Sequence, residues 1–209
     1  MELFASLPAW AQALAATLFT YAMTAAGASL VFFAKRLPHV FLTAATGLAA
    51  GIMIAASFFS LLLPAMDRLG GESKLYAAFV LALGFMAGCA FIVSADLVLT
   101  RSMREDQERE RGSALMCAAM TLHNVPEGFA VGVAFGSAAG TAGLAVAALM
   151  LALGIGIQNF PEGMCVALPL KRSGASAGRA FFIGQMSGAV EVPAGVLGAL
   201  AVGLISTLL

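Results

Sequence analysis

The sequence has 209 residues, which is enough for one domain or two. Hydrophobic residues make up 61% of it and charged residues only 11%, whereas roughly 25% of a soluble globular protein is charged. A chain this apolar would aggregate in water, so an ordinary soluble fold is excluded. The 11 basic and 11 acidic residues cancel, which leaves no long-range attraction to nucleic acid. The three cysteines are too few and too scattered for a disulfide framework or a thiolate zinc knuckle.

Six apolar stretches are each long enough to cross a bilayer, which takes about 20 mostly apolar residues. We predict spans at 8–34, 40–64, 75–99, 113–136, 142–170 and 177–207. The first has no basic residue ahead of it and is too long for a signal-peptide core, so we interpret it as a retained span. The sequence therefore predicts an all-α fold: a polytopic membrane helical bundle with six transmembrane helices in one domain, 1–209.

The basic residues of the connecting segments predict the orientation of this bundle. Two follow span 2, at Arg68 and Lys74. The segments after spans 1, 3 and 5 hold nine: Lys35, Arg36, Arg101, Arg104, Arg109, Arg111, Lys171, Arg172 and Arg179. Because basic loops collect on the cytoplasmic side, we expect these segments in the cytoplasm and both chain ends outside it. The strongly charged stretch 101–112 is then a solvated cytoplasmic loop.

Small residues recur four apart in several spans, a spacing that lets helix backbones approach closely. The glycine sets are Gly47/Gly51, Gly84/Gly88, Gly128/Gly132/Gly136 and Gly184/Gly188. They predict a compact helical bundle and say nothing about its function.

Acidic residues in or near the spans are the unexpected feature: Asp96, Glu127, Glu162 and Glu191. A charge at the bilayer centre costs at least about 2.5–3.5 kcal/mol. Three or four of them would cost on the order of 10 kcal/mol, which is comparable to the stability of a whole domain. These residues therefore need a function and a compensating partner.

Two of the acids belong to a polar motif that occurs twice. Residues 123–128 read HNVPEG and residues 158–163 read QNFPEG, 35 residues later. In each motif the first residue and the glutamate are four apart, so they project from one helix face. The proline removes an amide donor and pushes away the carbonyl four residues earlier. Broken helices with polar groups near the midplane are typical of a transporter's substrate site, and two antiparallel spans would let the motifs face each other.

The donors that converge there are one imidazole, two carboxylates and amide oxygens, with Glu191 as a third carboxylate in span 6. Such ligands suit a divalent cation like zinc, iron(II), manganese or cadmium. Two facing glutamates could also bridge two metal ions. Because the ligands must be deprotonated, we expect metal entry to displace protons and transport to depend on pH.

At these motifs, together with the segment EVPAG at 191–195, the chain resembles the ZIP (Zrt-, Irt-like) metal transporters. The glutamine that opens the second motif looks most like the GufA-like branch, and the similarity covers roughly residues 40–209. The resemblance implies a carrier of divalent metal ions, most of all zinc, into the cytoplasm across the cell membrane. It implies neither an enzyme nor a cofactor.

The resemblance also implies a ligand set for a binuclear site. The first metal is held by His123, Glu127, Gln158 and Glu162, joined by Met53 of span 2. The second is surrounded by Asn124, Asn159 and Glu191 together with the two motif glutamates, which bridge the ions. In the family, spans 1, 4, 5 and 6 are described as an elevator that slides against the other spans.

Three departures from the family pattern stand out. Family members have eight spans, and six are predicted here. We expect either that the sequence is truncated or that the protein replaces the two absent spans by oligomerising, for which a homodimer is one possibility. Asn159 stands where some relatives have aspartate, which predicts weaker binding of the second metal. The histidine-rich loop common after span 3 is replaced by the charged stretch 101–112.

The residues leave other readings open. An intramembrane metal-dependent hydrolase would also place His and Glu on one helix face, but no His-Glu-x-x-His is present. A passive channel favours rings of carbonyls or charges along a pore, whereas a cage of mixed ligands favours a carrier. Met53 could simply pack, and Asn124 and Asn159 could simply bind kinked backbone. Asp96 could line an exit path or pair with a basic neighbour, and Cys165 is more typical of an apolar filler.

Overall fold

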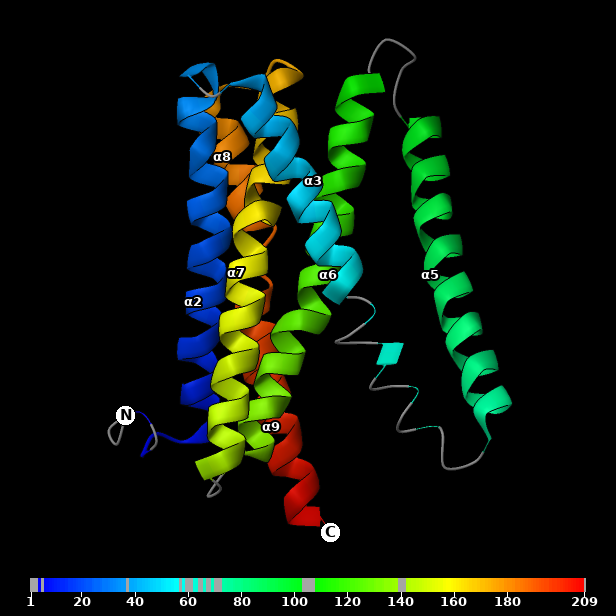
Figure 1. Cartoon of the computed structure of the whole chain (residues 1–209), viewed down its shortest axis with the longest axis vertical. Helices are drawn as coiled ribbons and strands as arrows, with labels where there is room; N and C mark the ends of the chain where they lie inside the picture. Colours follow the sequence, from blue (N-terminus) through cyan, green and yellow to red (C-terminus); the bar gives the residue numbers. More distant parts are fainter. Residues whose placement is uncertain are drawn as a thin grey trace. The chain divides into compact units, whose positions relative to one another are not determined.

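A computed structural model describes residues 4, 6–36, 38–56, 58, 62–63, 66, 69, 73–102, 108–138 and 142–208. Its elements are α2 (Ala9–Ser29), η1 (Leu30–Arg36), α3 (His39–Ala56), α5 (Lys74–Ser102), α6 (Glu108–Ser137), α7 (Ala142–Arg172), α8 (Ala177–Met186) and α9 (Glu191–Leu208). All of these are helices, and the described residues include no strand (Figure 1). The predicted all-α fold is therefore confirmed.

Four helical stretches are long and apolar enough to cross a membrane: Ala9–Phe33, Lys74–Phe91, Leu144–Arg172 and Ala177–Leu204. They coincide with predicted spans 1, 3, 5 and 6. The other two predicted spans contain α3 and α6. α6 is less apolar than its neighbours because it begins in a charged segment and carries the first polar motif.

The charged connector is shorter than the predicted loop 101–112. α5 continues to Ser102 and α6 begins at Glu108, while residues 103–107 lie outside the described part of the chain. Glutamate and arginine favour helix, and acidic residues in a first turn interact well with the helix dipole. The amino-acid composition therefore explains why α6 begins within the polar stretch, at Glu108, rather than after it.

The helix breaks fall at a different place from the one predicted. α6 and α7 remain helical through Pro126 and Pro161. Predicted span 6, at 177–207, is instead two helices, since α8 ends at Met186 and a turn at 187–190 precedes α9. Prolines are tolerated inside transmembrane helices when neighbouring groups satisfy the freed carbonyls, so proline position alone did not locate the break.

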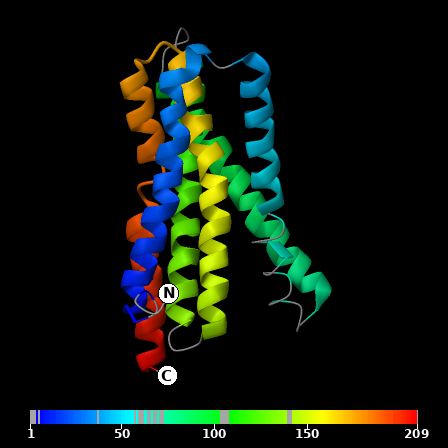
Figure 2. The same cartoon turned by 60° about the vertical axis from the view of Figure 1, so that its left-hand side comes forward.

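The chain divides into two compact units, residues 1–38 with 116–209 and residues 39–115. In the first unit α2 packs along α7, α8 and α9, and α8 also packs on α7, as the two views agree (Figures 1 and 2). Its apolar core lies where α6 ends and α7 begins. That core is built mostly of alanines from α2, α7 and α9, with Ala138 just after α6, around Val131, Phe135 and Ile155.

Close glycine contacts join the helices of this first unit. A Cβ at Gly132 would overlap the carbonyl oxygen of Gly195, and one at Gly163 would overlap that of Thr24. Backbones therefore touch between α6 and α9, as the spacing of Gly128, Gly132 and Gly136 predicts, and they also touch between α2 and α7. The contacts predicted for Gly47/Gly51 and Gly84/Gly88 are not found among the described residues.

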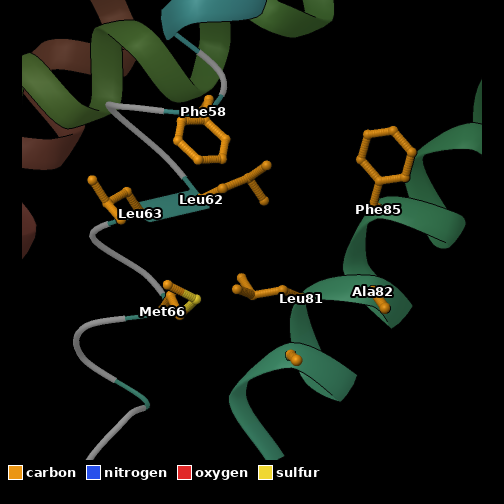
Figure 3. A pocket seen from close by; sticks show the side chains of 8 residues that line it. Phe58, Leu62, Leu63, Met66, Leu81, Ala82 and Phe85 are labelled. Carbon is orange, nitrogen blue, oxygen red and sulfur yellow. The ribbon is translucent and has the colours of Figure 1, made fainter. Parts of the chain in front are cut away.

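The second unit contains α3 and α5. The apolar stretch Lys74–Phe91 of α5 has only 6% of its residues buried, against 39% in the other three apolar stretches. An apolar cavity of about 330 Å³ lies beside α5 (Figure 3). It is lined by Phe58, Leu62, Leu63 and Met66 and, from α5, by Ala78, Leu81, Ala82 and Phe85.

Candidate metal centre

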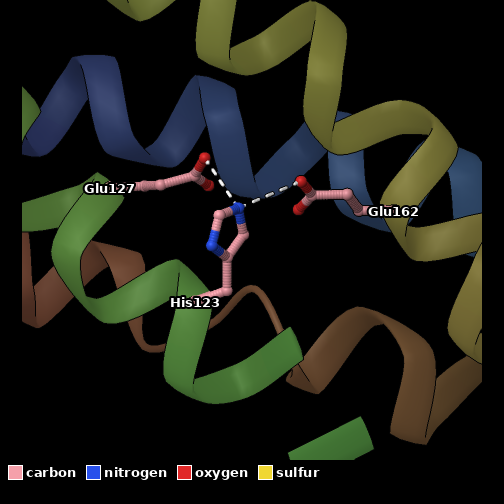
Figure 4. Close-up of side chains that lie close together, drawn as sticks. All are labelled: His123, Glu127 and Glu162. Atoms are coloured by element: carbon pink, nitrogen blue, oxygen red, sulfur yellow. Dashed lines mark ion pairs between the residues drawn. The ribbon is translucent and has the colours of Figure 1, made fainter. Parts of the chain in front are cut away.

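The two polar motifs meet inside the first unit. α6 carries His123 and Glu127 on one face, and α7 brings Glu162 toward the same imidazole nitrogen that Glu127 approaches (Figure 4). The distance from His123 Nε2 is 3.2 Å to Glu127 Oε1 and 3.7 Å to Glu162 Oε1. The two motifs thus face each other, as their spacing on antiparallel spans predicts.

These three side chains could hold a metal ion. One ligand atom from each lies within 4.8 Å of the others. Two nitrogen or oxygen ligands of zinc, each about 2.1 Å from the ion, are at most roughly 4.2 Å apart, so small side-chain shifts would complete the coordination. The side chain of Glu162 is fully buried, and those of Glu127 and His123 are 12% and 25% exposed.

Gln158 links the two glutamates. Its Nε2 donates to Glu127 Oε1 and, at 3.1 Å, to Glu162 Oε1. The amide therefore bridges a carboxylate of α6 and one of α7 while being 5% exposed itself. As a metal ligand Gln158 would present Oε1, the other end of the same group.

Five buried polar atoms of the motifs have no hydrogen-bond partner among the described residues. They are His123 Nε2, Asn124 Oδ1, Glu127 Oε2, Asn159 Oδ1 and Glu162 Oε2. Leaving such a group unsatisfied costs about 1–3 kcal/mol, and most buried polar groups in native proteins are paired. All five atoms are electron-pair donors, or become so in the neutral imidazole, which is the kind of group that binds a cation.

The two asparagines each use the nitrogen and leave the oxygen available. Asn124 Nδ2 donates to the Ser187 carbonyl at 2.9 Å. Asn159 Nδ2 donates to Glu191 Oε1 at 2.6 Å and to the Thr20 carbonyl at 3.2 Å. Both asparagines therefore bind groups on other helices or turns through their nitrogens, and the same bonds turn their oxygens away from those partners.

Glu191 differs from the motif glutamates because both of its oxygens are already engaged. Oε1 accepts from Asn159, and Oε2 accepts from Thr20 Oγ1 at 2.5 Å. The side chain is fully buried at the start of α9. The structure thus joins Glu191 to Asn159 of the second motif through a hydrogen bond, and its role as a metal ligand stays a prediction.

Thr20 is the residue of this site that sequence reasoning missed. It belongs to a stripe of fully buried threonines on α2: Thr17, Thr20 and Thr24. Three hydroxyls at helical spacing inside an apolar span are a signal that could have found it, since polar groups on one face of a membrane helix point to a polar interior.

Three further candidates from the sequence are Met53, Asp96 and Cys165. Met53 lies on α3 and Asp96 on α5, both in the second unit, and their side chains are outside the described set. Cys165 is a free, buried cysteine on α7. The prediction that Met53 is a ligand stays a prediction.

Comparison with known proteins identifies relatives. No family model matches the sequence. Over an alignment of 282 positions, the chain is 36% identical to zinc transporter ZIP11 of Homo sapiens, covering 95% of this chain and 82% of that protein. It is 39% identical over 204 residues to zinc transporter GufA of Myxococcus xanthus, covering 94% and 78%. It is 30% identical over 154 residues to zinc transporter ZupT of Nitratidesulfovibrio vulgaris, covering 71% and 50%.

Proposed function

Because this chain belongs to the ZIP family of zinc transporters, we propose that it carries divalent metal ions, zinc foremost, into the cytoplasm through a site within the membrane. One observation carries the proposal: His123, Glu127 and Glu162, from two different helices, bring one imidazole nitrogen and two carboxylates close enough together to hold a metal ion. The family consists of transport proteins rather than enzymes, so an intramembrane hydrolase is not favoured. The chain is a multi-pass membrane protein.

In this proposal the first ion binds His123, Glu127 and Glu162, with Gln158 as fourth ligand. Zinc takes four nitrogen and oxygen ligands readily, and the cation compensates the buried negative charge that makes these acids costly in hydrocarbon. A second ion binds between the asparagine oxygens and Glu191, sharing the two motif glutamates. Iron(II), manganese and cadmium are further substrates that the same ligand chemistry would accept.

We also propose that the protein crosses the membrane six times. The spans are the four apolar stretches together with α3 and α6, and both chain ends lie outside the cytoplasm. The first compact unit combines α2, most of α6, α7, α8 and α9. That division supports a movement in which spans 1, 4, 5 and 6 travel together. A homodimer and a single transport domain, 1–209, stay predictions.

Zinc uptake into vesicles that contain the purified chain tests the proposed function. We expect saturable uptake that falls more than about 100-fold in Glu127→Ala, because even changes outside the ligand shell cost 10–100-fold in metal affinity. Glu110→Ala, on the same helix and roughly 25 Å away along its axis, serves as control and should transport like the original chain. Linear uptake would indicate a channel, and hydrolysis of a lipid or peptide without uptake would indicate an enzyme.

Uptake should also fall as the external pH is lowered from about 8 to 5.5, the range in which imidazole titrates. Protons compete with the metal for the carboxylates and the imidazole, since only the deprotonated forms bind it. The measurement is initial zinc uptake at constant free zinc and constant internal pH. A rate that does not change over this range would contradict the proposed ligand set.

A further inference from the structure

α2 contributes to the centre through a residue outside both motifs. Thr20 is fully buried, its Oγ1 donates to Glu191 Oε2 at 2.5 Å, and its carbonyl accepts from Asn159 Nδ2 at 3.2 Å. We propose that Thr20 is a positioning residue that sets the orientation of Glu191 and Asn159 for metal binding. This inference rests on the proposed transport function and deepens it.

The hydrogen bonds of the Asn159 side chain support the positioning role of Thr20. A side-chain amide has two N–H donors and one oxygen. Here the nitrogen donates to both Glu191 Oε1 and the Thr20 carbonyl, which uses both hydrogens. The amide can therefore not turn over without losing two bonds, and Oδ1 is left as a buried acceptor with no partner among the described residues. That is the atom a cation would use.

Glu191 is held from two sides in the same way. Asn159 binds one of its oxygens and Thr20 binds the other. A carboxylate offers about four lone-pair sites, so one hydrogen bond on each oxygen still leaves room for a metal ion. Partners of this kind, which bind a ligand rather than the ion, fix ligand orientation in most metal sites.

Thr20 differs in this respect from its neighbours on the stripe. The Thr17 hydroxyl donates to the Ala13 carbonyl at 2.8 Å, and that of Thr24 to the Thr20 carbonyl at 3.4 Å. Both bonds stay within α2, the usual local use of a threonine in a helix. The Thr20 hydroxyl lies 3.0 Å from the Thr17 carbonyl as well, but its single hydrogen favours the shorter, charge-assisted bond to Glu191.

Backbone contacts keep α2 in register with the second motif. A Cβ at Gly27 would overlap the Phe160 carbonyl, and one at Gly163 would overlap the Thr24 carbonyl. Phe160 directly follows Asn159, and Gly163 directly follows Glu162. The separation between Thr20 and Asn159 is thus fixed by backbone packing, which is the condition for a positioning role.

Thr20→Val tests the proposal, because valine keeps the shape of threonine and removes the hydroxyl. We expect the KM for zinc uptake to rise about 10-fold, as loss of an outer partner of a metal ligand usually does, with Vmax per folded protein nearly unchanged. Thr20→Ser restores the hydroxyl and should return KM to within about twofold. Thr17→Val makes the same change one turn away, on an equally buried residue, and should leave KM unchanged.

Zinc-binding titrations of the same detergent-purified samples make the result independent of transport. Weaker zinc binding in Thr20→Val that is restored in Thr20→Ser supports the positioning role, whatever the vesicles show. Absence of saturable uptake would count against the proposed transport function and not against the positioning role. Equal affinity in Thr20→Val and the original chain, or equal weakening in Thr20→Ser, would overturn the positioning role. If the valine variant does not fold, the pair Thr20→Ala and Thr17→Ala gives the same comparison.

Discussion

Replacing Glu162 by glutamine is expected to abolish zinc binding and, at the same time, to stabilise the metal-free protein. Glu162 is fully buried, lies with Glu127 beside the same imidazole nitrogen, and has one oxygen with no hydrogen-bond partner in the part of the chain that the structure describes. Two carboxylates that share one buried site repel each other, so removing the charge of one of them relieves that repulsion. Glutamine has the same size without the charge, and its amide can donate to the remaining carboxylate. We expect zinc affinity to fall more than about 100-fold, since a ligand is lost.

Thermal unfolding in detergent, with and without zinc, measures both effects. Zinc at about 100 times its Kd should stabilise the original chain by about 2.7 kcal/mol through mass action. The Glu162→Gln protein should unfold at a higher temperature without zinc and show no further rise when zinc is added. Glu110→Gln, the same exchange at the start of α6, is the control. If the Glu162→Gln protein were less stable without zinc and were still stabilised by zinc, the idea that repulsion between the buried carboxylates destabilises the metal-free protein would be refuted.

The sequence was sufficient to predict the centre's principal pairing. The four-residue spacing places His123 and Glu127 on one face of α6, and antiparallel spans turn the second motif toward them. That His123 and Glu127 share a face follows from helix geometry, and that the second motif faces them follows from the opposite directions of the two spans. Neither inference needs knowledge of the packed structure. The cost of an acid in hydrocarbon then predicted that the glutamates would be clustered and buried rather than exposed to lipid.

The position of the helix break could not be predicted in the same way. Hydropathy reports only that 177–207 is long and apolar, and Pro126 and Pro161 attract attention as helix breakers. The turn at 187–190 is instead tied to tertiary structure, because the Ser187 carbonyl accepts from Asn124 on another helix. A partner 63 residues away is invisible to local patterns.

Glycine spacing shows the same limit. Gly128 and Gly132 on α6 touch the backbone of α9, whereas Gly84 and Gly88 on α5 have no described atom within 4 Å of a would-be Cβ. The two pairs have the same spacing, and only the presence of a neighbouring helix distinguishes them. Thr20 was missed for a related reason, since its role depends on α9 and α7 arriving beside α2.

Gly163→Ala is expected to be the most destabilising single methyl addition at the centre, while Gly154→Ala on the same helix should be harmless. A Cβ at Gly163 would overlap the Thr24 carbonyl, so α2 and α7 would have to separate. Overpacking of this kind typically costs 1–3 kcal/mol, and we expect the upper end because the obstacle is backbone. At Gly154 nothing lies within 4 Å, and alanine favours helix by up to about 1 kcal/mol.

The midpoints of thermal unfolding of the two variants, measured in the same detergent, provide the comparison. Because Gly163 follows Glu162 directly, separation of the helices should also pull Thr20 away from Asn159, and zinc affinity should fall together with stability. Gly154→Ala should retain both properties. If Gly163→Ala were as stable as Gly154→Ala, then the contact between α2 and α7 would be looser than the structure indicates. The register that places a threonine of the first span beside the ligands of the fifth would then lose its physical basis.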